Sequence, residues 1–297
     1  MTPYQSETDF SLMRPLLRSL LQKSVRRGYE DLSQKVAFTL ASRGDSAWLH
    51  ARAGVIVFEE CWPCAHLLNS GTPSVLTLRE VAVSFKNKDA AGLGALAHAA
   101  LGGDVTAIKQ AHDPIAVKIV TAALKRPEGF FKWALAECSC ESQTAVVLAA
   151  RSFFVRASWP WDKAFMAAGA YLSCQKGTPQ VSRCDQLPKT PFPFWSAVDK
   201  HTPQGKIALR RVASALHLQE LQLQWASFYF ESAKTNILTS SPWWECEVEW
   251  RLSALGLSLK EAEEMWVYAS PHIQRAVQEQ ASALLDLVGN SSSDALF

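Results

Sequence analysis

Residues 199–206, Asp-Lys-His-Thr-Pro-Gln-Gly-Lys, hold the densest group of chemically active side chains in the sequence. Asp199 and His201 lie two residues apart at a predicted turn between helices, where they could ligate a metal or act as an acid–base pair. With Lys206 and neighbouring glutamates they would suit a metal-dependent enzyme acting on nucleic acid. The same segment has a structural explanation, in which Thr202 caps a helix whose first residue is Pro203. Both interpretations stay open, and no definite catalytic constellation follows.

Four of the seven cysteines form two close pairs, Cys61 with Cys64 and Cys138 with Cys140. A two-residue gap is typical of a redox dithiol or of half a zinc site. A redox function favours a thioredoxin-like βαβ context, which this sequence does not predict. A zinc site that combined both pairs would have a non-standard spacing. We therefore expect reduced, buried thiols, with no metal and no cofactor.

The sequence offers no phosphate-binding loop. Such a loop requires glycine-rich backbone followed by Gly-Lys-Ser/Thr, so that amides cradle the phosphate and the hydroxyl holds magnesium. Gly205-Lys206 is followed by Ile207 and lacks the preceding glycine. Residues 55–60, Val-Ile-Val-Phe-Glu-Glu, resemble an acidic strand end of ATPases but lie within a helical period. We expect no nucleotide hydrolysis.

Basic residues gather in two places, at the end of the first predicted helix and after a proline-rich segment. Such clusters can neutralise phosphates, and nearby aromatic side chains could stack on bases. Acidic residues close to both clusters favour the alternative of a solvated surface. The candidate nucleic-acid contacts are Arg18, Lys23, Arg26, Arg27, Lys206, Arg210 and Arg211.

Composition describes an ordinary globular protein. Of 297 residues, 48% are hydrophobic and 20% charged, and the net charge of +2 creates no general attraction to nucleic acid or anionic membranes. Eleven tryptophans indicate a thick core or an aromatic binding surface. The aromatic segments 225–230 and 243–251 are interpreted as core or as a subunit interface, and core is favoured. No apolar run is long enough to span a bilayer, and no signal peptide begins the chain. We expect a cytoplasmic protein without membrane contact.

Helical periodicity dominates, which predicts an all-α fold of many helices. Gly44 is expected to end one helix, and Pro271 to kink or split the last. The proline-rich segment 176–193 predicts a linker. We predict a helical bundle over 1–100, its continuation over 101–190, a C-terminal helical subdomain over 194–288 and a disordered tail over 289–297.

Residues 23–28, Lys-Ser-Val-Arg-Arg-Gly, followed by Asp31 and by Arg52 leading to Glu59-Glu60, support one family resemblance. They are similar to the helical collar of the replication-associated recombination ATPases, which are AAA+ proteins related to clamp loaders. That family has Lys-Ser-Ile-Arg-Gly, and its second helix ends in Glu-Asp followed by Val-Gly. Here Gly28 comes one residue later, Glu60 replaces the aspartate, and Cys61-Trp62 replaces Val-Gly. The resemblance covers roughly 15–100, and the ATPase domain has no counterpart.

The resemblance implies a module that oligomerises or docks on DNA-replication partners. We therefore predict a non-catalytic accessory protein of DNA replication, recombination or repair, a homo-oligomer with DNA and replication or recombination proteins as partners. One alternative is the metal-dependent enzyme centred on Asp199 and His201. A second is a regulatory protein-interaction factor of a mobile element.

Overall fold

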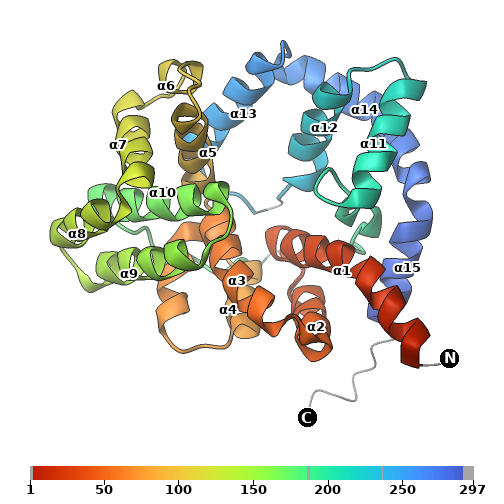
Figure 1. Cartoon of the computed structure of the whole chain (residues 1–297), viewed down its shortest axis with the longest axis horizontal. Coiled ribbons are helices and arrows are strands. Elements are labelled where there is room, and N and C mark those ends of the chain that lie inside the picture. Colours follow the sequence, from red (N-terminus) through yellow and green to blue (C-terminus); the bar gives the residue numbers. More distant parts are fainter. Residues whose placement is uncertain (1–2, 186–187, 236, 290–297) are drawn as a thin grey trace. The chain divides into compact units, whose positions relative to one another are not determined.

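The computed structural model describes residues 3–185, 188–235 and 237–289, and these are mostly helical (Figure 1). Within these ranges the only β-type pairings are isolated bridges, such as those between Cys61 and Asn87 and between Lys86 and Leu238. The all-α fold predicted from the periodicity is confirmed. None of the described helices combines the length and apolar character needed to cross a membrane.

The chain forms two compact units, and neither is one continuous stretch. Of the described residues, unit 1 contains 3–46, 188–235 and 252–289, and unit 2 contains 47–185 and 237–251. These units do not follow the expected boundaries. Residues 3–46 pack with segments from the middle and end of the chain, whereas the helices that follow them pack with one another up to residue 185 and with 237–251.

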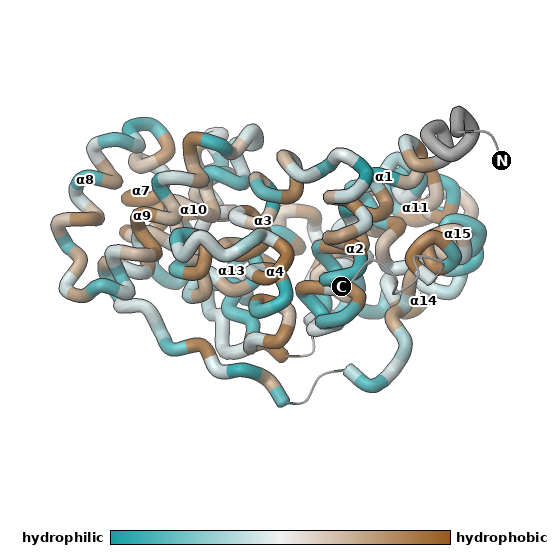
Figure 2. The backbone as a smooth tube through the Cα atoms, turned by 90° about the horizontal axis from the view of Figure 1, so that it is seen from below, coloured by the Kyte–Doolittle hydropathy of each residue, from teal (hydrophilic) through white to brown (hydrophobic). Residues whose placement is uncertain are grey.

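Unit 1 is built around the C-terminal half of its first helix. The apolar stripe of that helix, which includes Leu16, Leu20 and Val25, is completely buried. Figure 2 shows hydrophobic and hydrophilic residues sharing the last helix, which buries Leu284 and Val288. The elements of unit 1 are α1 (Pro3–Arg26), α2 (Glu30–Leu40), η1 (Ala41–Asp45), η3 (Phe194–Ala197), α11 (Pro203–Ala215), α12 (Glu220–Ser227), η4 (Phe228–Ser232), α14 (Leu259–Ala276) and α15 (Gln278–Gly289).

Unit 2 is a helical bundle in which α10 is the central helix, in contact with α5, α7, α8 and α9 (Figure 1). Most of α10 is buried, and its many small side chains allow neighbouring helices to approach closely. The elements of unit 2 are α3 (Ser46–Cys61, from Ala47 onward), η2 (Trp62–Asn69), α4 (Ser74–Val83), α5 (Asp89–Leu101), α6 (Thr106–Lys109), α7 (Pro114–Lys125), α8 (Pro127–Glu137), α9 (Glu141–Arg156), α10 (Pro160–Lys176) and most of α13 (Pro242–Ala254).

Predicted helix ends have mixed outcomes. Gly44 has a φ of +88° at the kink that ends α2, as predicted. Residues 177–185 and 188–193 contain no helix, in agreement with the predicted linker. The last helical stretch is split, but at Val277 between α14 and α15 and not at Pro271, which lies within α14. The predicted disordered tail lies outside the described residues, except Gly289, which ends α15.

A buried lysine organises the centre of unit 2. The Lys86 ammonium is fully buried and donates to the carbonyl oxygens of Val81 at 2.7 Å, Ala82 at 2.9 Å and Ser84 at 2.6 Å. It thereby satisfies carbonyls at the end of α4, where a cation is also favoured by the helix dipole. The Lys86 backbone pairs with Ile237 and Thr239, and the neighbouring amides of Phe85 and Asn87 donate to the carbonyls of Ser182 and Glu60, so four chain segments meet near this residue. Burial lowers the pKa of Lys86 to about 8.

We predict that Lys86→Met lowers the free energy of unfolding by roughly 2–4 kcal/mol, because buried carbonyls lose their donor.

An unfolded lysine keeps its proton up to its ordinary pKa of 10.5, whereas folded Lys86 releases it near pH 8. Between these values the unfolded state binds more protons, so the stability of the wild type rises with pH. The loss caused by Lys86→Met should therefore be larger at pH 10 than at pH 7 in urea unfolding. Lys118→Met, at an exposed position of α7, is the control and should change stability little at either pH.

Candidate functional site

The turn before α11 is shaped by its own side chains. The Thr202 hydroxyl accepts a hydrogen bond from the Gly205 amide at 3.1 Å and donates one to the Asp199 carbonyl at 2.9 Å. Pro203 occupies the first turn of the helix. A Cβ at position 205 would lie only 1.9 Å from the Asp199 carbonyl oxygen, so this turn requires glycine. The structural explanation of the segment, a threonine cap followed by proline, is confirmed.

Asp199 is the electrostatic centre of this turn. Its Oδ2 lies 2.8 Å from the Lys23 Nζ and 3.0 Å from the His201 Nδ1. The side chains of Asp199 and Lys23 are each only 4% exposed, whereas the imidazole of His201 is 58% exposed. The structure thus joins the predicted Asp–His pair to a lysine that lies 176 positions earlier in the sequence.

The pKa values of Asp199 and Lys23 are both shifted by their surroundings. Burial alone would raise the pKa of Asp199, but the Lys23 ammonium and the His201 ring together hold it well below its ordinary value. Burial lowers the pKa of Lys23, against the opposing effect of the Asp199 carboxylate. Asp199 is therefore ionised at neutral pH and neutralises a cation that water cannot reach.

The other two cations at the end of α1 also point into unit 1. Arg26 is 2% exposed and donates to the carbonyl of Ser232, and Arg27 is 5% exposed. Arg27 donates to the Glu231 carbonyl at 2.5 Å and to its Oε1 at 2.6 Å. Both arginines thereby satisfy carbonyls at the end of η4, a π-helical turn. In this structure Lys23, Arg26 and Arg27 bind protein acceptors and do not face solvent, contrary to the expectation of phosphate contacts.

The remaining candidate contacts differ in exposure. Arg18 forms a two-pronged ion pair with Asp45, with N–O distances of 2.9 and 3.0 Å. Three cations on α11 are exposed, and among the described residues only one of them has an ion pair, at 3.3 Å to Glu220. These exposed cations are Lys206, Arg210 and Arg211.

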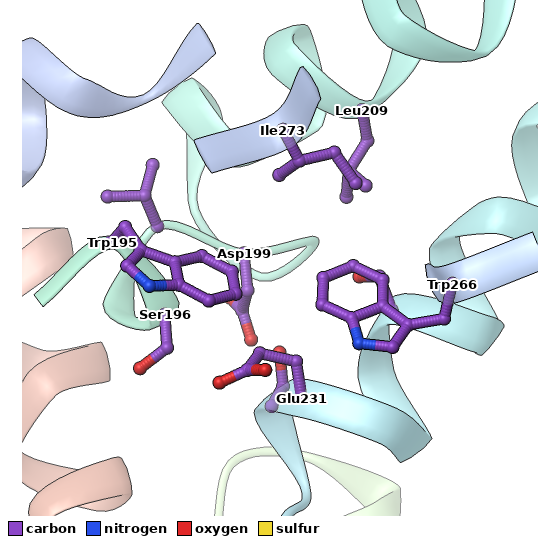
Figure 3. Close-up of a pocket in the computed structure, with 10 residues that line it drawn as sticks. Trp195, Ser196, Asp199, Leu209, Glu231, Trp266 and Ile273 are labelled. Carbon is purple, nitrogen blue, oxygen red and sulfur yellow. The ribbon is translucent and has the colours of Figure 1, made fainter. Parts of the chain in front are cut away.

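A small cavity lies behind the Asp199 turn (Figure 3). The indoles of Trp195 and Trp266 flank it, and the carboxylates of Asp199 and Glu231 point toward the space between them. The buried Ser196 hydroxyl also lines it and has no hydrogen-bond partner among the described residues. Its volume of about 10 Å³ has room for roughly one water molecule. This cavity therefore cannot hold an organic substrate.

An aromatic cluster borders the same turn on its solvent side. The Lys200 Nζ lies 3.0 Å from the ring centroid of Trp225 and 4.4 Å from that of Phe228. The ring of Tyr229 stacks on Trp225 with centroids 5.5 Å apart, and His201 meets Phe228 edge-on. These three aromatic side chains are only partly buried, whereas Trp243 and Trp250 of the second aromatic segment are buried, so the interpretation as core is confirmed for the second segment and only in part for the first. The position of the first segment beside Lys200-His201 depends on folding and could not be read from local sequence.

The metal-ion alternatives have no ligand set. Within the described residues, no three His, Cys, Asp or Glu side chains gather in a way that could hold a metal. The sulfur atoms of Cys61 and Cys64 are 3.5 Å apart, but Cys138 and Cys140 do not complete a zinc site with them. Asp199 and His201 are brought together, whereas Lys206 lies on the exposed face of α11. The pair could move a proton at the exposed ring, but the small cavity beside it offers no substrate site.

Comparison of the chain with protein-family models, with curated proteins and with solved structures finds no match.

We predict that Lys23→Met lowers the free energy of unfolding by roughly 3–5 kcal/mol, because Asp199 then remains as a buried charge without its ammonium partner. The double variant Lys23→Met/Asp199→Leu should lose less than the sum of the single changes in urea unfolding. The pKa of Asp199 is lowered by folding, so its contribution is complete above about pH 4 and is lost as pH falls toward the folded value. Asp199→Asn should remove this part of the acid dependence.

The exposed pair Arg210–Glu220 is the matched control for that cycle. Arg210→Met, Glu220→Leu and the double variant should each change stability by less than about 1 kcal/mol. The structural role of the Lys23–Asp199 pair would be contradicted if its single variants lost as little free energy of unfolding as those of the exposed pair and if their losses were additive.

Proposed function

We propose that this protein is a non-catalytic nucleic-acid-binding accessory factor whose contact surface combines the exposed face of α11 with the aromatic cluster of the same unit. The observation that carries the proposal is the combination of outward-facing cations on α11 with partly buried rings of Trp225, Phe228 and Tyr229 in the same unit. Single-stranded nucleic acid is bound in proteins by cationic grooves together with aromatic platforms.

The charge pattern of α11 supports this surface. Lys206 and Arg210 lie one helical turn apart, Arg211 follows directly, and the helix contains no acidic residue. The opposite face packs through Leu209 and Val212, which fixes the cations toward solvent. The ion pair from Arg210 to Glu220 is exposed, so exchanging it for a phosphate costs little.

The aromatic cluster favours a single strand over a duplex. Trp225 and Tyr229 have partly exposed rings, and a base that stacks on Trp225 takes the place of the Lys200 ammonium on that ring. Bases stack in this way only when they are unpaired. Lys200 lies over Trp225 and adds a positive charge beside the rings. The expected ligand is therefore unpaired DNA or RNA of mixed sequence, bound through its phosphates and base faces.

The resemblance of residues 15–100 to the collar of replication-associated recombination ATPases adds a context to this proposal. It favours single-stranded DNA at replication or recombination intermediates, cytoplasmic action, and assembly with itself or with replication proteins. The residues that carry the resemblance, Lys23, Arg26 and Arg27, then support the contact surface from inside unit 1. A metal-dependent enzyme is not proposed, because no metal-ligand group exists among the described side chains.

We predict that replacing Lys206, Arg210 and Arg211 together by alanine weakens binding of a fluorescein-labelled 20-nucleotide DNA strand at least 10-fold in anisotropy titrations at low salt. Three lost phosphate contacts should also reduce the slope of log K against log salt by about 2. The matched control replaces the exposed Lys118, Lys125 and Lys132 of unit 2 by alanine, which removes the same charge. Equal binding by both triple variants would refute the assigned surface.

We predict that Trp225→Ala weakens single-stranded DNA binding by roughly 5- to 100-fold, equivalent to the ~1–3 kcal/mol of one base–aromatic stack. Binding of a duplex of the same sequence should change little, and Trp225→Phe should restore most of the affinity for the single strand. An equal loss for single strand and duplex would indicate that Trp225 acts only through folding or charge placement.

A further inference from the structure

Cys61-Trp62-Pro63-Cys64 lies at a sharp change of helix type in unit 2. The α3 helix ends at Cys61, whose backbone (φ −159°, ψ 70°) leaves the helical region, and η2 begins at the next residue. Pro63 has no amide hydrogen and cannot continue α3. The change of direction brings the two sulfur atoms to 3.5 Å from each other.

The two thiols are in different environments. Cys61 is completely buried and donates to the carbonyl of Phe85 at 3.2 Å. Cys64 is 3% exposed and its sulfur lies 3.9 Å from the hydroxyl of Ser84. The contact with Cys61 lowers the pKa of Cys64, and the Ser84 hydroxyl and the nearby Lys86 charge lower it further. The same contact and burial raise the pKa of Cys61 well above its ordinary value.

Because the pKa of Cys64 is lowered and that of Cys61 is raised, the two cysteines suit different steps of disulfide formation. The thiolate is the reactive form of cysteine, so Cys64 is suited to attack and Cys61 to act as the second, resolving thiol. Closing a disulfide requires the sulfur atoms to approach from 3.5 Å to about 2.05 Å, which side-chain rotation and a small backbone shift can supply. The ring that it closes contains only four residues, so it would restrict the unfolded chain less than long-range disulfides do. A reversible chemical role therefore fits the pair better than a structural one.

We propose that Cys61 and Cys64 form a reversible dithiol–disulfide site that is oxidised by hydrogen peroxide. The Cys64 thiolate attacks one peroxide oxygen and breaks the O–O bond, which gives a sulfenic acid on Cys64 and releases hydroxide. The Cys61 sulfur then attacks the Cys64 sulfur, loses its proton, and displaces the sulfenic oxygen as water. Two thiols and one peroxide thus become one disulfide and two waters, and a dithiol reductant reverses the change.

Hydrogen peroxide suits this site as an oxidant because it is small. Both sulfur atoms are nearly inaccessible, so a bulky disulfide such as oxidised glutathione has no direct approach. The other cysteines supply internal comparisons. Cys174 is buried with a pKa raised to about 11, which disfavours its thiolate. Cys140 is exposed with a lowered pKa, and its sulfur contacts the Ser142 hydroxyl at 3.1 Å.

The test treats the folded full-length protein with a small molar excess of hydrogen peroxide, blocks remaining thiols with N-ethylmaleimide during unfolding, and maps peptides by mass spectrometry. We expect a species lighter by two hydrogens, about 2 Da, that links Cys61 to Cys64 and disappears after dithiothreitol. Cys174→Ser should behave like the wild type.

Two single variants separate the roles. Cys61→Ser should accumulate a dimedone-reactive sulfenic acid on Cys64, whereas Cys64→Ser should give no such adduct on Cys61. Full alkylation of residues 61 and 64 after peroxide treatment, with oxidation confined to other cysteines, would overturn the proposal. A disulfide that forms only when peroxide is added in urea would overturn it as well, because the folded geometry would then play no part.

Discussion

The buried ion pair between Lys23 and Asp199 is the interaction on which unit 1 depends. Each of these side chains would be expensive to bury alone, because an ion loses its hydration in the interior. The pair therefore fixes α1 against the turn that starts α11 much more strictly than apolar contact would. Arg26 and Arg27 extend the same constraint to η4, where their guanidinium groups satisfy the last carbonyls of the π-helical turn. Three positive charges at the end of α1 thereby fix the positions of two segments that are distant in sequence, the turn before α11 and η4.

Local sequence was sufficient for elements whose determinants are local. Period-3.6 patterns located the helices, Thr202-Pro203 located a helix start, and Gly44 located a helix end. Pro271 did not locate a helix end, because α14 continues through this proline. The two-unit organisation was beyond local reasoning, because it depends on which amphipathic faces meet after the chain returns at residues 188 and 252.

The candidate site shows the same division between local and non-local information. Asp199 and His201 are close in sequence, so their contact could be predicted, whereas the partner that decides their electrostatics is Lys23. A cluster of Lys and Arg in the sequence indicates positive charge, but it does not show whether the side chains face the interior or the solvent. At the end of α1 the cations meet acceptors within unit 1, and on α11 the apolar residues beneath turn the cations outward. Burial of the counter-charge, which only folding determines, separates a buried arginine that supports the fold from one that faces solvent.

The discontinuous composition of unit 1 has a consequence for how the protein is made. Lys23 emerges during synthesis 176 residues before Asp199, a delay on the order of 10–30 s at the usual rates of bacterial and eukaryotic translation. During that interval the basic end of α1 has no native partner and must stay hydrated. Residues 47–185 can begin to collapse earlier, but they also wait for 237–251. Neither unit can therefore complete its core on a nascent chain that lacks its last quarter, and premature termination there would leave α1 as a solvated basic helix without a fold to join.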